Sequence, residues 1–170
     1  MKKSMILVIS IFVIIFLGLG IISTKKYYEK KGYSNNLEKS SEEVLKNFTG
    51  TSKEDRATLL ITGSALWTEG NKELAIKYFE KAYELGSAGG AEKLYQAYTE
   101  LGDEEKKKEW ELKGAEMGVA WIQYNLGISY KKSGDLGEAE KWYLKSAEQN
   151  YSEAQNNLGA CYRDGKGVQK

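Results

Sequence analysis

Apolar residues recur every three or four positions along most of the chain after residue 53, which is the spacing of one face of an α-helix. Glycine or asparagine interrupts this pattern at regular intervals. One series of breaks is Gly86, Gly118 and Asn150, and the other is Gly70-Asn71, Gly102-Asp103 and Gly134-Asp135. Both series have a spacing of 32 residues, so the pattern indicates an internal repeat.

Each repeat is predicted to hold two antiparallel helices. Gly or Asn can take the left-handed conformation that ends a helix, and a following Asp or Asn can cap the next helix. One helix pair cannot bury its own apolar stripe, so neighbouring pairs must stack. The stripe of the first unit is Leu74, Ala75, Tyr78, Phe79, Ala82 and Leu85. We therefore predict an all-α fold, a short right-handed α-solenoid of antiparallel helix pairs.

The predicted units cover residues 54–86, 87–118, 119–150 and, in part, 151–168. Small residues at Ala82, Gly114 and Ser146 should let neighbouring backbones approach closely. The second unit carries Lys106 and Lys107 where its neighbours have Leu or Ala, so looser packing or a shifted register is expected there. The periodic aromatic residues are predicted to lie in the core: Tyr78, Tyr98, Trp110, Tyr130, Trp142, Tyr143 and Tyr162.

The N-terminal region begins with an apolar stretch of 18 residues at 5–22, preceded by Lys2 and Lys3. As a helix it would span roughly 27 Å, close to the thickness of the bilayer core. We expect residues 1–26 to be an uncleaved membrane anchor. A cleaved signal peptide is the alternative, because Gly18-Leu19-Gly20 supplies small residues for cleavage.

The orientation in the membrane is harder to predict, because lysines also follow the apolar stretch at positions 25, 26, 30 and 31. The short basic N-terminus is the usual form of an export signal and favours repeats outside the cytoplasm. Residues 27–53 are polar and charged, and we interpret them as a stalk with a short helix near 37–48.

Charge and composition exclude several classes of function. Beyond residue 26 there are 21 basic and 24 acidic side chains, which disfavours a nucleic-acid-binding face. The chain has no histidine and a single cysteine, Cys161, so we expect no disulfide framework, no metal site, no cofactor and no enzyme activity. Cys161 shares its repeat position with Ala97 and Ser129, which indicates a small packing residue.

Three segments resemble the Sel-one-like repeat, a relative of the tetratricopeptide repeat. They are GVAWIQYNLGISY at 118–130, EAEKWYLKSAEQN at 138–150 and SEAQNNLGACYRDGKGV at 152–168. The first unit, GNKELAIKYFEKAYELG, looks more like a plain tetratricopeptide unit, and the resemblance covers about residues 54–168. In the family, a second helix follows the Gly-Lys-Gly-Val turn. The last helix is therefore expected to be covered by a subunit, a partner or a folded-back tail.

The resemblance implies a protein that binds a protein or peptide on the surface formed by the first helix of each unit. It also suggests a bacterial origin. The candidate contact residues vary between units: Trp67, Glu92, Gln96, Trp121, Tyr124, Ile128, Lys131, Asn156 and Arg163. Of these, we expect Trp67, Trp121 and Tyr124 to contribute most, because they do not follow the repeat and Trp and Tyr are common at binding hot spots.

The predicted function is thus an adaptor or scaffold at the bacterial inner membrane. Two alternatives stay open: a scaffold that self-associates through its last helix, and an immunity or inhibitor protein directed against an envelope toxin. A β-lactam-directed enzyme is disfavoured, because the sequence supplies no paired nucleophile and base.

Overall fold

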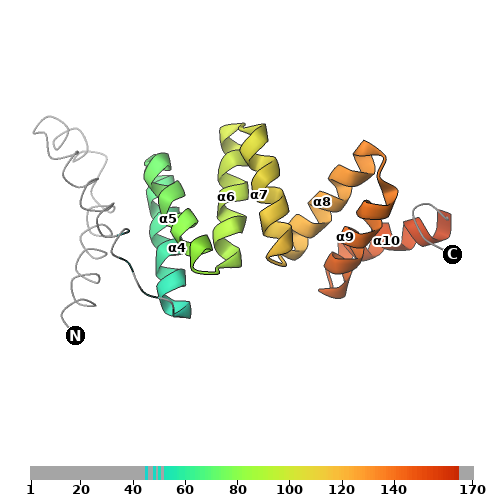
Figure 1. The fold of residues 1–170 in the computed structure, drawn as a ribbon, viewed down its shortest axis with the longest axis horizontal. Helices are drawn as coiled ribbons and strands as arrows, with labels where there is room; N and C mark the ends of the chain where they lie inside the picture. The colour runs from blue at the N-terminus through green and yellow to red at the C-terminus, as the bar shows by residue number, and fades with distance from the viewer. Residues whose placement is uncertain (1–44, 46–47, 49, 51, 165–170) are drawn as a thin grey trace, which may run out of the picture. The chain divides into compact units, whose positions relative to one another are not determined.

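The computed structural model describes residues 45, 48, 50 and 52–164, and every regular element in this part of the chain is an α-helix (Figure 1). The apolar stretch at 5–22, nearly all of the stalk and the turn at 165–168 lie outside the described residues. No helix within the described part is long and apolar enough to cross a bilayer. The chain divides into two compact units, residues 1–85 and 86–170, which we describe separately.

The first unit contains helices α4 (Lys53–Thr68) and α5 (Lys72–Glu84), which pack against each other. A reciprocal capping box fixes the start of α4. The Ser52 hydroxyl accepts from the Asp55 N–H at 3.0 Å, and the Asp55 carboxylate accepts from the Ser52 N–H at 3.0 Å. Leu45 and Phe48, which precede α4, are also buried.

The contact between α4 and α5 depends on a glycine. A Cβ added to Gly63 would lie 2.5 Å from the ring of Phe79, so the ring occupies the space that a side chain would need. Most of the predicted apolar stripe of α5 is buried, namely Leu74, Ala75, Tyr78, Phe79 and Ala82, while Leu85 is half-buried.

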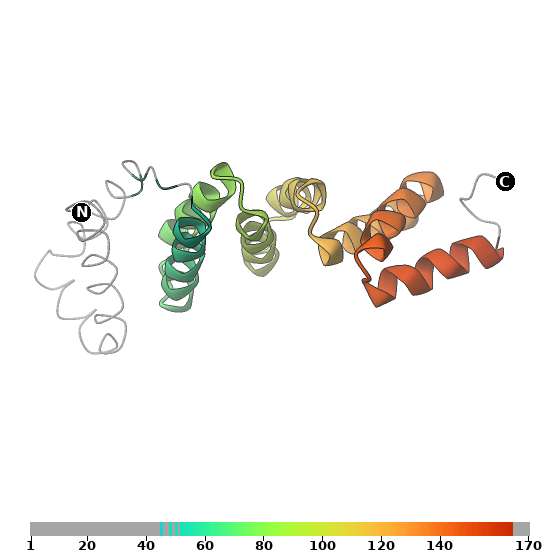
Figure 2. The same cartoon turned by 90° about the horizontal axis from the view of Figure 1, so that it is seen from below.

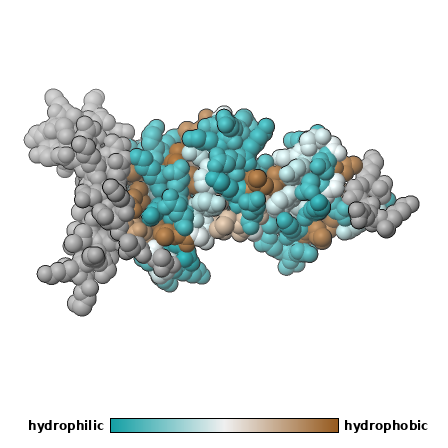
Figure 3. Space-filling model, viewed as in Figure 1, coloured by the Kyte–Doolittle hydropathy of each residue, from teal (hydrophilic) through white to brown (hydrophobic). Residues whose placement is uncertain are grey.

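The described part of the second unit, residues 86–164, contains five helices, each packed against the next (Figure 2). They are α6 (Ala88–Leu101), α7 (Glu104–Glu116), α8 (Ala120–Ser133), α9 (Leu136–Glu148) and α10 (Ser152–Asp164). The all-α prediction with adjacent helix pairs is confirmed. Hydrophilic residues cover most of the surface of α6 and α7 that is visible in Figure 3.

The predicted helix boundaries are confirmed by the backbone. Five turn glycines and Asn150 have positive φ, from 64° at Asn150 to 89° at Gly134. The predicted caps hold at Asp103 and Asp135, whose carboxylates accept first-turn N–H groups at 3.1 and 3.0 Å. Asn71 occupies the predicted N-cap position of α5 but does not cap the helix with its side chain. Its ψ is 61°, against 89° and 81° at the two aspartates, and its side chain makes no capping hydrogen bond.

The glycine-to-aromatic contact recurs between α8 and α9. A Cβ added to Gly127 would lie 2.7 Å from the ring of Tyr143, which is completely buried. In the α6/α7 pair the aromatic residue instead lies on the first helix, as Tyr95, and the facing position on the second helix is Glu111. In the α6/α7 pair the large aromatic side chain is therefore on the first helix, whereas in the α4/α5 and α8/α9 pairs it is on the second.

The expected register shift in α7 does not occur. Trp110, Glu111 and Gly114 are buried, as are their counterparts 32 residues later on α9. A Cβ at Gly114 would lie 2.7 Å from Ile122 Cδ1, so α7 approaches α8 closely. Lys107 is tolerated at the start of α7 because it forms an ion pair with Glu104 at 3.1 Å.

Lysine recurs in the last turn of α7 and of α9, and in both helices it contacts a tryptophan of the same helix. Lys113 Nζ lies 4.2 Å from the ring centroid of Trp110, and Lys145 Nζ lies 3.9 Å from that of Trp142. Each cation covers the outer face of a mostly buried indole. The repeat therefore conserves a cation–π pair as well as apolar contacts.

The aromatic core is largely as predicted, with two exceptions. Tyr130 is half-buried and packs against the core, whereas Tyr162 is 53% exposed, so its assignment to the core was wrong. Tyr162 is exposed because it lies on α10, the last helix of the described residues. Tyr98, the counterpart of Tyr162 on α6, is contacted by Lys106 of the following helix, and within the described residues no helix follows α10.

Matched glycine substitutions test the packing of these pairs. Gly127→Ala and Gly159→Ala gain the same helix propensity, but only the first places a Cβ against a buried ring, since no described atom lies within 4 Å of a Cβ at Gly159. We expect the free energy of unfolding of the Gly127 variant to fall below that of the Gly159 variant by about 1–3 kcal/mol in urea titrations. Equal stabilities would contradict the packing described.

Candidate interaction surface

Most of the predicted contact residues lie on the first helices of successive pairs. Within the second unit these are α6, α8 and α10, and we call their shared surface the α6/α8/α10 face. Its predicted members are Glu92 and Gln96 on α6, Trp121, Tyr124, Ile128 and Lys131 on α8, and Asn156 and Arg163 on α10. Trp67 belongs to the first unit, where Lys72 Nζ lies 4.7 Å from its ring centroid.

Trp121 is held in place between α8 and α6. Its indole N–H donates to Glu92 Oε1 at 3.1 Å, and its ring meets the ring of Tyr95 edge-on with centroids 5.3 Å apart. Asn125 adds a second polar link, donating to the Tyr95 hydroxyl at 3.5 Å. Trp121 nevertheless stays partly exposed, so part of the fixed indole is available for contact.

Tyr124 lies one turn after Trp121 on the same face of α8 and is held by residues of α9, α10 and the turn between them. Its ring packs against Tyr143 and Tyr151, with centroid distances of 5.8 and 5.3 Å. Its hydroxyl accepts from Asn157 of α10 at 3.2 Å. Ile128 also lies on this face and packs against the core cluster that contains Tyr143. Tyr124 and Ile128 therefore contribute to packing as well as to the surface.

The remaining candidates on the face are exposed: Gln96, Lys131, Asn156 and Arg163. The structure brings together Glu92 with Trp121, and Tyr124 with Ile128. The sequence did not identify Tyr95, Asn125, Tyr151 and Asn157 as parts of the face. A signal existed for two of them, because Asn125 and Asn157 share one repeat position and are both polar.

A buried polar cluster lies behind Trp121. Glu111 of α7 is only 7% exposed and accepts from the Ser129 hydroxyl at 3.2 Å, and Tyr95 forms a further hydrogen bond with its carboxylate. Burial raises the pKa of Glu111, and burial together with the nearby Glu111 charge raises the pKa of Tyr95. The cluster ties α6, α7 and α8 together and positions the ring on which Trp121 rests.

The raised pKa of Glu111 predicts how stability depends on pH. The folded protein binds the proton more tightly than the unfolded chain, so the stabilisation is complete below the ordinary value of 4.5 and is lost as pH rises through the raised pKa. Lys107 opposes the shift and Glu104 adds to it. Glu111→Gln should therefore be more stable than the parent in urea at neutral pH and equal to it at pH 4. A less stable variant at neutral pH would contradict this account.

The described residues offer little for metal or nucleophilic chemistry. No group of three or more His, Cys, Asp or Glu side chains among them could hold a metal ion. Cys161 is half-buried and packs against the core cluster of Ala139, Tyr143 and Leu158. The surface is thus characterised by aromatic rings and side-chain amides.

Comparison with known families agrees with the helix pairs. The tetratricopeptide-repeat family matches residues 59–85 and 122–153, and the Sel1-repeat family matches residues 152–170. No curated protein matches the chain. Residues 86–121 lie between the matched segments. They include the α6/α7 pair, in which Tyr95 stands where the neighbouring pairs have glycine and Glu111 where they have an aromatic residue. Repeats of both families are protein-interaction modules and are typically non-catalytic. The matched parts of the chain, residues 59–85 and 122–170, are therefore repeats of the tetratricopeptide and Sel1 type.

Proposed function

We propose that this protein is an adaptor or scaffold that binds a peptide segment of a partner protein on the α6/α8/α10 face. One observation carries the proposal: Trp121 is partly exposed, yet Glu92 and Tyr95 fix its orientation. A large ring that is already ordered loses little conformational freedom on binding, and such residues dominate the energy of many interfaces.

The exposed polar side chains of the α6/α8/α10 face suggest the chemistry of the ligand. Gln96 and Asn156 are exposed side-chain amides, and each carries both a donor and an acceptor, as a peptide bond does. These groups suit the backbone of an extended segment, while Trp121 suits one apolar or aromatic anchor residue of that segment. Lys131 and Arg163 add positive charge near the ends of α8 and α10.

The proposed location is the bacterial inner membrane, with the repeats outside the cytoplasm. The support is the apolar stretch at 5–22 behind a short basic N-terminus. A Glu105→Cys, Cys161→Ser variant should react with a membrane-impermeant maleimide in intact spheroplasts, because residue 105 is exposed on α7. Labelling only after lysis would place the repeats in the cytoplasm instead.

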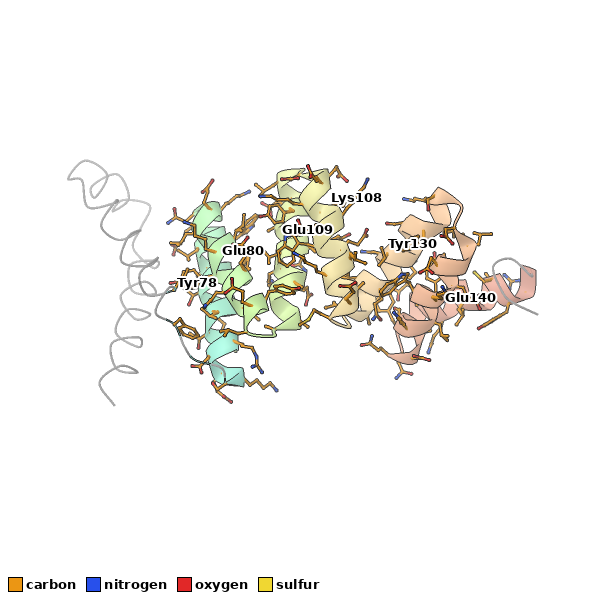
Figure 4. All side chains as sticks on the ribbon, viewed as in Figure 1. Tyr78, Glu80, Lys108, Glu109, Tyr130 and Glu140 are labelled. Carbon is orange, nitrogen blue, oxygen red and sulfur yellow. The ribbon has the colours of Figure 1, made fainter. Side chains whose placement is uncertain are left out.

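Site-specific photocrosslinking tests the binding face. A photoreactive amino acid at Gln96 of α6 lies on the α6/α8/α10 face. One at Lys108 replaces an exposed side chain of α7, labelled in Figure 4, and α7 is not part of that face. Both positions are exposed, so neither insertion should disturb folding. The proposal predicts a discrete crosslinked protein from position 96 and none from position 108. Crosslinks of equal yield from both positions, or from 108 alone, would overturn it.

A further inference from the structure

Glu92 of α6 carries a charge that no basic side chain balances within the described part of the chain. Its carboxylate has one partner there, the indole of Trp121, whose Nε1–H donates to Oε1 at 3.1 Å. An indole is neutral, so this hydrogen bond leaves the carboxylate without a countercharge. Glu92 is also partly buried beside α8, where salt and water screen a charge less than at an open surface.

Several glutamates on the second helices of the pairs are balanced locally. A lysine three or four residues away on the same helix forms an ion pair with each of them: Lys81 with Glu84, Lys107 with Glu104, Lys113 with Glu109, and Lys141 with Glu138. Glu92 has no lysine or arginine at these spacings, which hold Ala88, Gly89, Tyr95 and Gln96. The adjacent Lys93 donates to Gln96 Oε1 at 3.5 Å. The α6 helix therefore holds an acidic side chain that its own sequence does not pair.

The ring beside Glu92 also differs from the other tryptophans of the chain. A lysine lies over each of the other three rings: Lys72 over Trp67 at 4.7 Å, Lys113 over Trp110 at 4.2 Å, and Lys145 over Trp142 at 3.9 Å. Among the described residues no such cation lies over Trp121. The positions three and four residues from it hold Met117, Gly118, Tyr124 and Asn125. A carboxylate and an indole that both lack a cation are thus in direct contact on the α6/α8/α10 face.

A long basic side chain suits both groups at once. Lysine and arginine can lay an apolar stem along an aromatic ring and keep the charged head beyond it, and a guanidinium can stack on an indole while donating to a carboxylate. Lys131, the predicted contact residue of α8 with positive charge, lies ten residues after Trp121, or about 15 Å along the helix. That distance exceeds the Debye length of about 8 Å at physiological ionic strength, so Lys131 repels a cation at Glu92 only weakly.

We propose that the peptide segment bound on the α6/α8/α10 face carries an arginine or lysine beside its anchor residue, with the stem across the Trp121 ring and the cation on the Glu92 carboxylate. This inference rests on the proposed function and adds a charge requirement to it. Residues two apart in an extended segment point to the same side and lie about 7 Å apart, so the anchor and the basic residue can both reach the indole.

A phage-displayed library of random peptides, selected on the immobilised full chain, supplies the probes. Selected peptides that lose binding to Trp121→Ala should share a basic residue beside an apolar or aromatic one. In calorimetric titrations, replacing this basic residue by methionine should weaken binding to the parent chain by about tenfold. The same replacement should change binding to Glu92→Gln by less than about twofold, because glutamine still accepts from the Trp121 N–H but carries no charge. Glu100→Gln, at an exposed position of the same helix, is the matched control and should keep the full preference for the basic residue.

The peptides and variants separate the outcomes. Peptides that need Trp121 but tolerate loss of their basic residue would overturn the inference and leave the proposed function standing. An equal loss of affinity with the parent chain and with Glu92→Gln would show that the cation pairs elsewhere, and would also overturn it. A Glu100→Gln variant that loses the preference as fully as Glu92→Gln would mean that overall charge, and not this contact, selects the peptide. If no selected peptide depends on Trp121, the inference and the proposed function both fail.

Discussion

Tyr143→Ala is expected to lower the free energy of unfolding of the second unit by about 3–5 kcal/mol. The side chain is completely buried, its ring fills the space over Gly127, and it joins Ala139 and Leu158 in one core cluster. Urea unfolding followed by circular dichroism measures the loss. Tyr162→Ala is the matched control, since that ring is 53% exposed and should contribute less than about 1 kcal/mol. Similar losses from both variants would contradict the assigned core.

The hydroxyl of Tyr143 gives a second control with the opposite sign. It is buried without a hydrogen-bond partner among the described residues, and burial raises the pKa of Tyr143 to about 12. Tyr143→Phe should therefore stabilise the unit by about 1 kcal/mol, because it removes an unsatisfied polar group while keeping the ring. Phenylalanine already fills this position in the first unit, as Phe79. A destabilised Phe variant would show that the hydroxyl has a partner.

Trp121→Ala is expected to weaken binding of the crosslinked partner by about 30-fold, or roughly 2 kcal/mol. The indole is the largest partly exposed group on the α6/α8/α10 face, and two residues of α6 fix its position. Calorimetric titration with the partner captured at position 96 measures the effect.

Two controls make the Trp121 result interpretable. Lys108→Ala alters an exposed side chain on α7 and should change the affinity less than threefold, or by less than about 0.7 kcal/mol. Trp121→Ala also removes a contact with Tyr95, so the helicity and unfolding of that variant must be measured alongside. Unchanged affinity in a folded Trp121 variant would contradict the proposed hot spot.

The sequence predicts the helix pairs well, because the determinants are local. A glycine or asparagine with positive φ follows each helix from α4 to α9, and an aspartate caps two of the helices that come next. The predictions that fail depend on contacts between residues that are far apart in the sequence. Tyr162 occupies a core position of the repeat but has no following helix to cover it among the described residues, so periodicity alone misassigns it.

The surface is less predictable than the fold for the same reason. The sequence selects Glu92 and Trp121 as candidates, but their hydrogen bond spans 29 residues and depends on how α6 and α8 pack. The Tyr95 and Glu111 pair shows a further limit. Each residue departs from the repeat, and the two departures make sense only when the facing positions of a helix pair are known. Spacing along one helix does not contain that information.

The most direct test of the account is a crosslinking pulldown from membranes with the tagged full chain, compared with the Trp121→Ala, Tyr124→Ala variant at matched helicity. The account predicts one specific protein, recovered in amounts comparable to the chain and depleted from the variant. Recovery of the chain alone, unaffected by the two substitutions, would contradict binding through the α6/α8/α10 face and would support a self-associating scaffold.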